Sequence, residues 1–148
     1  MSVPARPAPP AWKARAAVFA AALWWGSLSV TGFLAVPTLF ASLPTPALAG
    51  NVAARLFSAQ GWVAVGCALV LLFAARSDEG SSMRWRGGVL AFVIAGLLLA
   101  LLGEFAVAPR IMARENLRLW HGLGTGMYVV QWLCAALVLW RVAPPPAA

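Results

Sequence analysis

Four long apolar runs make up most of this chain, and they restrict its possible folds more than any other feature. They cover about residues 14–36, 53–75, 86–108 and 119–140. At about 1.5 Å per helical residue, the first run alone reaches roughly 34 Å. That length exceeds the ~30 Å hydrocarbon core of a bilayer, where isolated strands cannot satisfy their backbone groups. The runs therefore predict an all-α integral membrane protein, a bundle of four spanning helices.

The composition argues against a soluble domain. Of the 148 residues, 62% are hydrophobic and 10% are charged, whereas a soluble domain has about 25% charged residues. A soluble fold of this size has too little interior for so much apolar surface. We expect one membrane domain over residues 14–141, with disordered tails at 1–13 and 142–148. The basic start resembles a signal peptide, but the first run is too long for one, so we expect an uncleaved helix.

Prolines and charged turns separate the runs. Pro37 is expected to end the first helix, because proline lacks the backbone N–H that a helix interior needs. The uncharged connection 37–52 follows, either as a short interfacial helix or as an extended segment. The Gly/Ser-rich stretch 76–85 is typical of a turn. Pro109 is expected to break the third helix before a basic loop of about ten residues.

The distribution of Lys and Arg predicts the orientation. The side with both termini carries seven basic residues, and the opposite side carries four. The positive-inside rule therefore predicts that both termini lie in the cytoplasm. We expect the membrane to be the bacterial inner membrane. Trp12, Trp85 and Trp140 lie near the expected inner boundary, as in an aromatic belt. The seven are Arg6, Lys13, Arg15, Arg76, Arg84, Arg86 and Arg141, and the four are Arg55, Arg110, Arg114 and Arg118.

Polar residues of all four runs fall in their outer halves, whereas the inner halves are almost entirely apolar. The main exception is Gln131, near the middle of the fourth run. A pore or proton wire needs polar groups at every depth. The pattern instead predicts a shallow polar cup open to the periplasm. The candidate residues of this cup are Thr31, Gln60, Glu104, Arg110, His121 and Thr125.

Glu104 is the most informative of these residues, because a carboxylate inside a membrane helix is costly and usually faces the bundle. Arg55, Arg110 and His121 are candidate partners at the outer ends of the helices. Two interpretations remain open. Glu104 either reaches the interface or locks two helices together, or it forms a ligand or ion site.

His121, the single histidine of the chain, also has two interpretations. It either donates to a neighbouring helix end at the interface or acts as a pH-responsive or metal-binding group. Met112 and Met127 complete no recognisable ligand set with it. We therefore expect no cofactor, although a haem or copper site that uses His121 remains an alternative. The cysteines, Cys67 and Cys134, are expected to act as small apolar packing residues.

Small residues predict where helices approach one another closely. Gly122 and Gly126 form a G-x-x-x-G pair in the fourth run, and Ser27 and Thr31 lie four residues apart in the first. The glycine face is expected to pack against another span of the bundle, or alternatively against a second copy in a homodimer. Besides the lipid bilayer, partners from a membrane complex are possible, and nothing in the sequence indicates nucleic acid.

Three short motifs at the ends of the runs connect the chain to a known family. G-F-L-A-V-P-T-L-F contains Pro37 and Phe40, V-A-P-R-I contains Pro109, and L-W-H-G contains His121. Over about residues 16–140 they resemble a bacterial four-span membrane family, domain of unknown function 4149, which is related to eukaryotic transmembrane protein 205. The resemblance implies the fold and a membrane location, but no particular activity.

The chain departs from the pattern of that family at two places. It has Gly124, Thr125 and Met127 where a Ser and then an Asn are expected, and Glu104 where a neutral polar residue is usual. No nucleophile–base pair, phosphate loop or H-E-x-x-H motif indicates an enzyme. The sequence favours a protein of solute transport, sensing or membrane-complex assembly, with haem or copper handling and a purely structural role as alternatives.

Overall fold

The computed structural model describes residues 11–76 and 88–144, and all of its long elements are helices. Four of them are long and apolar enough to span a membrane, which confirms the predicted all-α membrane bundle. The spans are Ala11–Ser42, Pro46–Ala75, Leu90–Met112 and Leu117–Val142. The elements are α1 (Ala11–Val30), the π-helical turn η1 (Thr31–Ala35), α2 (Val36–Ser42), α3 (Pro46–Arg76), α4 (Leu90–Leu102), the π-helical turn η3 (Gly103–Val107), α5 (Ala108–Met112) and α6 (Leu117–Val142).

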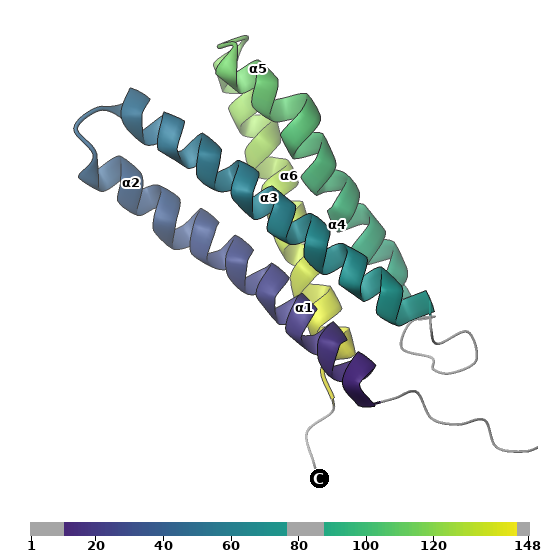
Figure 1. Ribbon diagram of the computed structural model, residues 1–148. Helices are drawn as coiled ribbons and strands as arrows, with labels where there is room; N and C mark the ends of the chain where they lie inside the picture. The colour runs from purple at the N-terminus through teal and green to yellow at the C-terminus, as the bar shows by residue number, and fades with distance from the viewer. Residues whose placement is uncertain (1–10, 77–87, 145–148) are drawn as a thin grey trace, which may run out of the picture.

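The helices form two antiparallel hairpins. The first hairpin runs from α1 through α2 into α3, and the second runs from α4 through α5 into α6 (Figure 1). The hairpins pack together near the two chain ends and diverge towards α2 and α5 (Figure 1). The predicted turn at 76–85 and most of the expected tails lie outside the described residues.

The prediction that Pro37 ends the first helix is wrong. The helix continues through Pro37 to Ser42, so the expected connection 37–52 shrinks to residues 43–45. The turn before the proline is π-helical, and the N–H of Val36 donates to Thr31 O, five residues back. This wider turn displaces the backbone carbonyls with which the proline ring would otherwise clash. The hydroxyl of Thr38 then donates to Leu34 O at 2.7 Å.

Pro109 is accommodated in the same way, so the third helix does not break there either. In η3 the N–H of Ala108 donates to Gly103 O, and α5 continues to Met112. The basic loop is therefore short and covers residues 113–116. It closes with two left-handed residues, Arg114 at φ 57° and Asn116 at φ 33°, a conformation that asparagine tolerates better than most residues.

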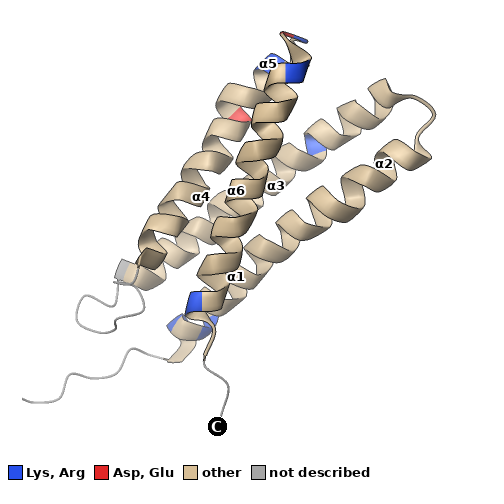
Figure 2. Cartoon of the chain, turned by 180° about the vertical axis from the view of Figure 1, so that it is seen from behind, with Lys and Arg blue, Asp and Glu red and all other residues tan. Residues whose placement is uncertain are grey.

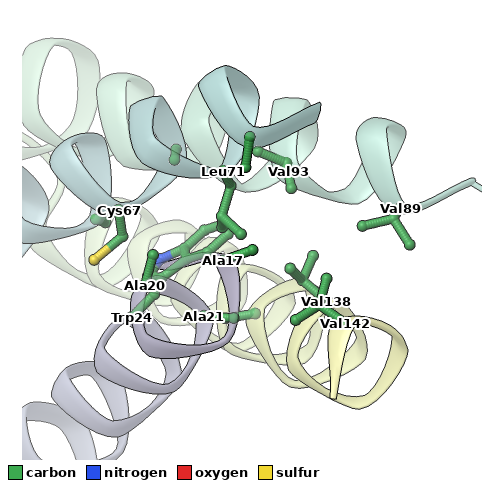
Figure 3. Packing of buried hydrophobic residues seen from close by; sticks show 14 of the residues in the cluster. Ala17, Ala20, Ala21, Trp24, Cys67, Leu71, Val89, Val93, Val138 and Val142 are labelled. Carbon is green, nitrogen blue, oxygen red and sulfur yellow. The ribbon is translucent and has the colours of Figure 1, made fainter. Parts of the chain in front are cut away.

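The core of the bundle lies in the half near the two chain ends, and it is built mainly from small residues around one large ring. Trp24 is fully buried on α1, with Leu71, Val93 and Val138 facing it from the other three helices (Figure 3). Small residues allow the backbones to come close enough for this packing, which holds helices together where lipid competes for every apolar contact. The small members include Ala17, Ala20, Ala21, Ala64, Cys67, Ala68 and Ala135.

Candidate functional site

Glu104 forms a hydrogen bond between the two hairpins. It is the second residue of η3, and its Oε1 accepts a hydrogen bond of 2.6 Å from the hydroxyl of Ser58 on α3. Since the helix continues through Pro109 to Met112, Glu104 lies about 12 Å from the helix end. The partner is thus Ser58, and not one of the three basic residues that the sequence offered. Ser58 was missed because a single serine in an apolar run gives no signal of its own.

The carboxylate borders a small hollow between the hairpins, which we call the Glu104 hollow. Its volume is about 10 Å³, close to the minimum for one water molecule. Trp62 and Phe105 stand edge to face beside it, with ring centroids 6.4 Å apart. These two rings are 57% and 66% exposed, so the hollow lies at the side of the bundle, where lipid would surround it. The lining residues are Gly61, Trp62, Val65, Ala100, Leu101, Glu104 and Phe105.

The second oxygen of the Glu104 carboxylate lies beside Gly61. A Cβ placed on Gly61 would lie 4.0 Å from Oε2 of Glu104, and both residues line the hollow. One oxygen is therefore engaged by Ser58, and the other lies near Gly61 at the border of the hollow. A carboxylate has about four acceptor positions in total, so the hydrogen bond from Ser58 leaves further positions for a second donor.

We call a line of contact between two neighbouring helices a seam. The contacts of Glu104 form one seam, between η3 and α3, and a similar seam joins η1 to α6 on the opposite side of the bundle. The second residue of this π-helical turn is Gly32, where a Cβ would lie 2.6 Å from Cε1 of Tyr128. The third residue, Phe33, meets Trp132 edge to face at 5.6 Å. The hydroxyl of Tyr128 donates to Leu28 O at 2.7 Å. The Tyr128 ring therefore fills this seam.

The two seams share one construction. In each, the second residue of the π-helical turn faces a hydroxyl side chain, and the third packs against a tryptophan four residues further along the partner helix. They differ in filling, because the Tyr128 ring lies directly against Gly32, whereas Glu104 borders the hollow.

Two other candidates, Gln60 and Thr31, lie elsewhere, and Gln60 connects α3 with α1. Gln60 is 6% exposed, and its Nε2 is 3.5 Å from Oγ of Ser27, a hydrogen bond at the upper limit of length. Thr31 is likewise buried, at the start of η1. On the other side of α1, Ser29 accepts a 2.9 Å hydrogen bond from Nε1 of Trp132. These contacts hold helices together within the bundle.

The remaining candidates of the predicted cup lie on the surface of the second hairpin. Arg110 donates to Ala106 O at 2.6 Å and stacks over the ring of Trp120 at 4.6 Å. Nδ1 of His121 is 3.0 Å from Leu117 O, and its side chain is exposed, as is that of Thr125. The six candidates thus occupy three separate places. Within the described ranges, no three His, Cys, Asp or Glu side chains come together as metal ligands.

The glycines of α6 pack differently from the prediction. A Cβ on Gly122 or Gly126 would meet nothing within 4 Å, whereas one on Gly124 would lie 3.2 Å from Val107. The face that packs inside the bundle is therefore that of Gly124, because the helix rotates the G-x-x-x-G pair outward. Packing of Gly122 and Gly126 against another span of the same chain is contradicted, and the homodimer alternative stays a prediction.

With this geometry in place, comparison with known proteins assigns the chain to a family. The profile of the family described as Domain of unknown function (DUF4149) matches residues 19–119. The chain belongs to this family. No curated protein and no solved structure matches it. The matched residues of the chain include Ser58, Glu104, all residues that line the hollow and both π-helical turns. His121 and the G-x-x-x-G pair lie after the end of the match.

Proposed function

We propose that this multi-pass membrane protein is not an enzyme and that it recognises a primary ammonium group at Glu104, as a small-solute transporter subunit or a sensor would. The observation that carries the proposal is the Glu104 carboxylate itself. One of its oxygens is held by Ser58, and the other lies near Gly61, at the border of a hollow the size of one water molecule. Placing a carboxylate at such a position in a membrane helix costs free energy, and a bound cation would offset that cost.

The size and the walls of the hollow favour a primary ammonium over a quaternary one. An –NH₃⁺ group resembles a water molecule in size and has three hydrogen-bond donors, so it suits the carboxylate oxygen beside Gly61. A trimethylammonium group is far too large for about 10 Å³ and has no N–H to donate. The exposed faces of Trp62 and Phe105 add cation–π attraction for a charge at the rim.

Exchange of the carboxylate for an amide should abolish this recognition. We expect dodecylammonium to raise the thermal unfolding midpoint of the wild-type protein in phosphatidylcholine nanodiscs. At a hundredfold excess over Kd the stabilisation should reach about 2.7 kcal/mol. Dodecyltrimethylammonium should give no comparable rise. Glu104→Gln should fold and still accept the Ser58 hydrogen bond, but lose the response to the primary amine.

The matched control is Glu115→Gln, which removes the carboxylate of the exposed turn after α5 and should respond as the wild type does. Equal stabilisation by both amphiphiles would refute recognition of a primary ammonium. An undiminished response in Glu104→Gln would place the amine elsewhere.

We further propose that the protein lies in the bacterial inner membrane with both termini in the cytoplasm. Lys13 and Arg15 at the start of α1 and Arg141 at the end of α6 lie at the same end of the bundle, and basic residues lie at both ends (Figure 2). A green fluorescent protein fused after Ala148 should fluoresce, because it folds in the cytoplasm. Activity of alkaline phosphatase at the same fusion point would instead require the reverse orientation.

A further inference from the structure

We propose that the primary ammonium at Glu104 belongs to an aminophospholipid, and that Arg55 binds the phosphate of the same headgroup. The inference rests on the proposed function, since it names the molecule that carries the amine. It adds a second recognition element on α3 and a source for the ligand, the bilayer itself.

The sequence of α3 places the two groups on one side of the helix. Arg55 precedes Ser58 by three residues, and Trp62 follows Ser58 by four, spacings that bring side chains together on one helix face. Arg55 is exposed and lies about 4.5 Å nearer the α2 end than Ser58. A positive group thus stands roughly one turn from the carboxylate that Ser58 holds.

This pair of opposite charges complements a zwitterion. A guanidinium binds phosphate oxygens through two parallel N–H donors, and the carboxylate takes the ammonium. In an ethanolamine headgroup, only two carbons and an ester oxygen separate the ammonium from the phosphorus. With the phosphate at Arg55, this short arm would extend along α3 towards Ser58 and bring its ammonium to the Glu104 carboxylate.

The surroundings of the hollow favour a lipid over a dissolved solute. The rings of Trp62 and Phe105 flank it and are largely exposed, so it can be reached from the hydrocarbon side. From the hollow towards the chain ends, α3 and α4 carry further exposed apolar side chains, among them Leu98 on α4 and Leu69 on α3. Acyl chains can lie along this surface while the headgroup stays at the level of the two charges.

Titration of lipids into the detergent-solubilised protein, followed by native mass spectrometry, tests the inference. Phosphatidylethanolamine should bind about tenfold tighter or more than phosphatidylcholine with the same acyl chains, because charge-assisted hydrogen bonds from the ammonium to Glu104 are lost on trimethylation. Arg55→Gln should weaken both lipids, but leave binding of dodecylammonium unchanged. Glu104→Gln should remove the preference between the two lipids.

The control is Arg110→Gln, whose guanidinium stacks on Trp120 and should not affect the preference. Free phosphoethanolamine should compete poorly, since it lacks acyl chains. Equal affinity for the two lipids, or an Arg55→Gln protein that binds both as the wild type does, would overturn the lipid inference. If dodecylammonium still binds through Glu104 in that case, the proposed function stands; if it does not, both fail.

Discussion

Replacing Gly96 with alanine should destabilise the bundle by about 3 kcal/mol, at the upper end of the range for overpacked cores. A Cβ on Gly96 would lie 2.5 Å from Cζ2 of Trp24 and 3.7 Å from Cβ of Cys134. Trp24 is fully buried among residues of all four helices (Figure 3), so its ring cannot move aside without displacing them. The clash outweighs the gain of up to about 1 kcal/mol that alanine brings over glycine in a helix interior.

Gly103→Ala is the matched control, because Gly103 lies on the same continuous helix and a Cβ there would meet nothing within 4 Å. It should be neutral or slightly stabilising. Unfolding in mixed micelles, followed by circular dichroism, measures both variants. If Gly96→Ala unfolds at the same denaturant fraction as Gly103→Ala, the Trp24 ring does not pack against α4 as described.

The number of helices and their type could be predicted from the sequence because they depend on the length and apolarity of each run. The ends of the helices could not. Pro37 and Pro109 were expected to stop them, yet each follows a π-helical turn that admits the ring. Whether a proline breaks a helix depends on the hydrogen bonds of the turn before it, and those bonds leave no mark in composition or periodicity.

The candidate site could be predicted only in part, because depth along a helix can be counted from the sequence but direction around its axis is harder to infer. Glu104 does face a neighbouring helix, as the cost of a buried carboxylate suggested. Thr125, at a comparable depth, and His121, nearer the helix end, lie on the exposed side of α6. Ser58 gave no signal, since its role depends on which residue of the other hairpin it faces.

Filling the hollow should abolish amine recognition without removing any charge. In Gly61→Ala the new Cβ would lie 4.0 Å from Oε2 of Glu104, an ordinary van der Waals distance. It should therefore leave the hydrogen bond from Ser58 in place while occupying the space next to the carboxylate. We expect binding of dodecylammonium to weaken by about tenfold or more, the loss of one charge-assisted hydrogen bond. Stability should be unchanged or higher by up to about 1 kcal/mol.

Gly66→Ala tests whether that loss is specific to the hollow. Gly66 lies on the same helix, and a Cβ there would meet nothing within 4 Å, so the variant shares any gain in helix propensity but should bind the amine as the wild type does. The comparison complements Glu104→Gln, which removes the charge and keeps the space. Loss of binding in both Glu104→Gln and Gly61→Ala requires that the amine contact the carboxylate from inside the hollow. Normal binding by Gly61→Ala would mean that Glu104 attracts the amine from the surface of the bundle, and that the size of the hollow does not select primary ammonium groups.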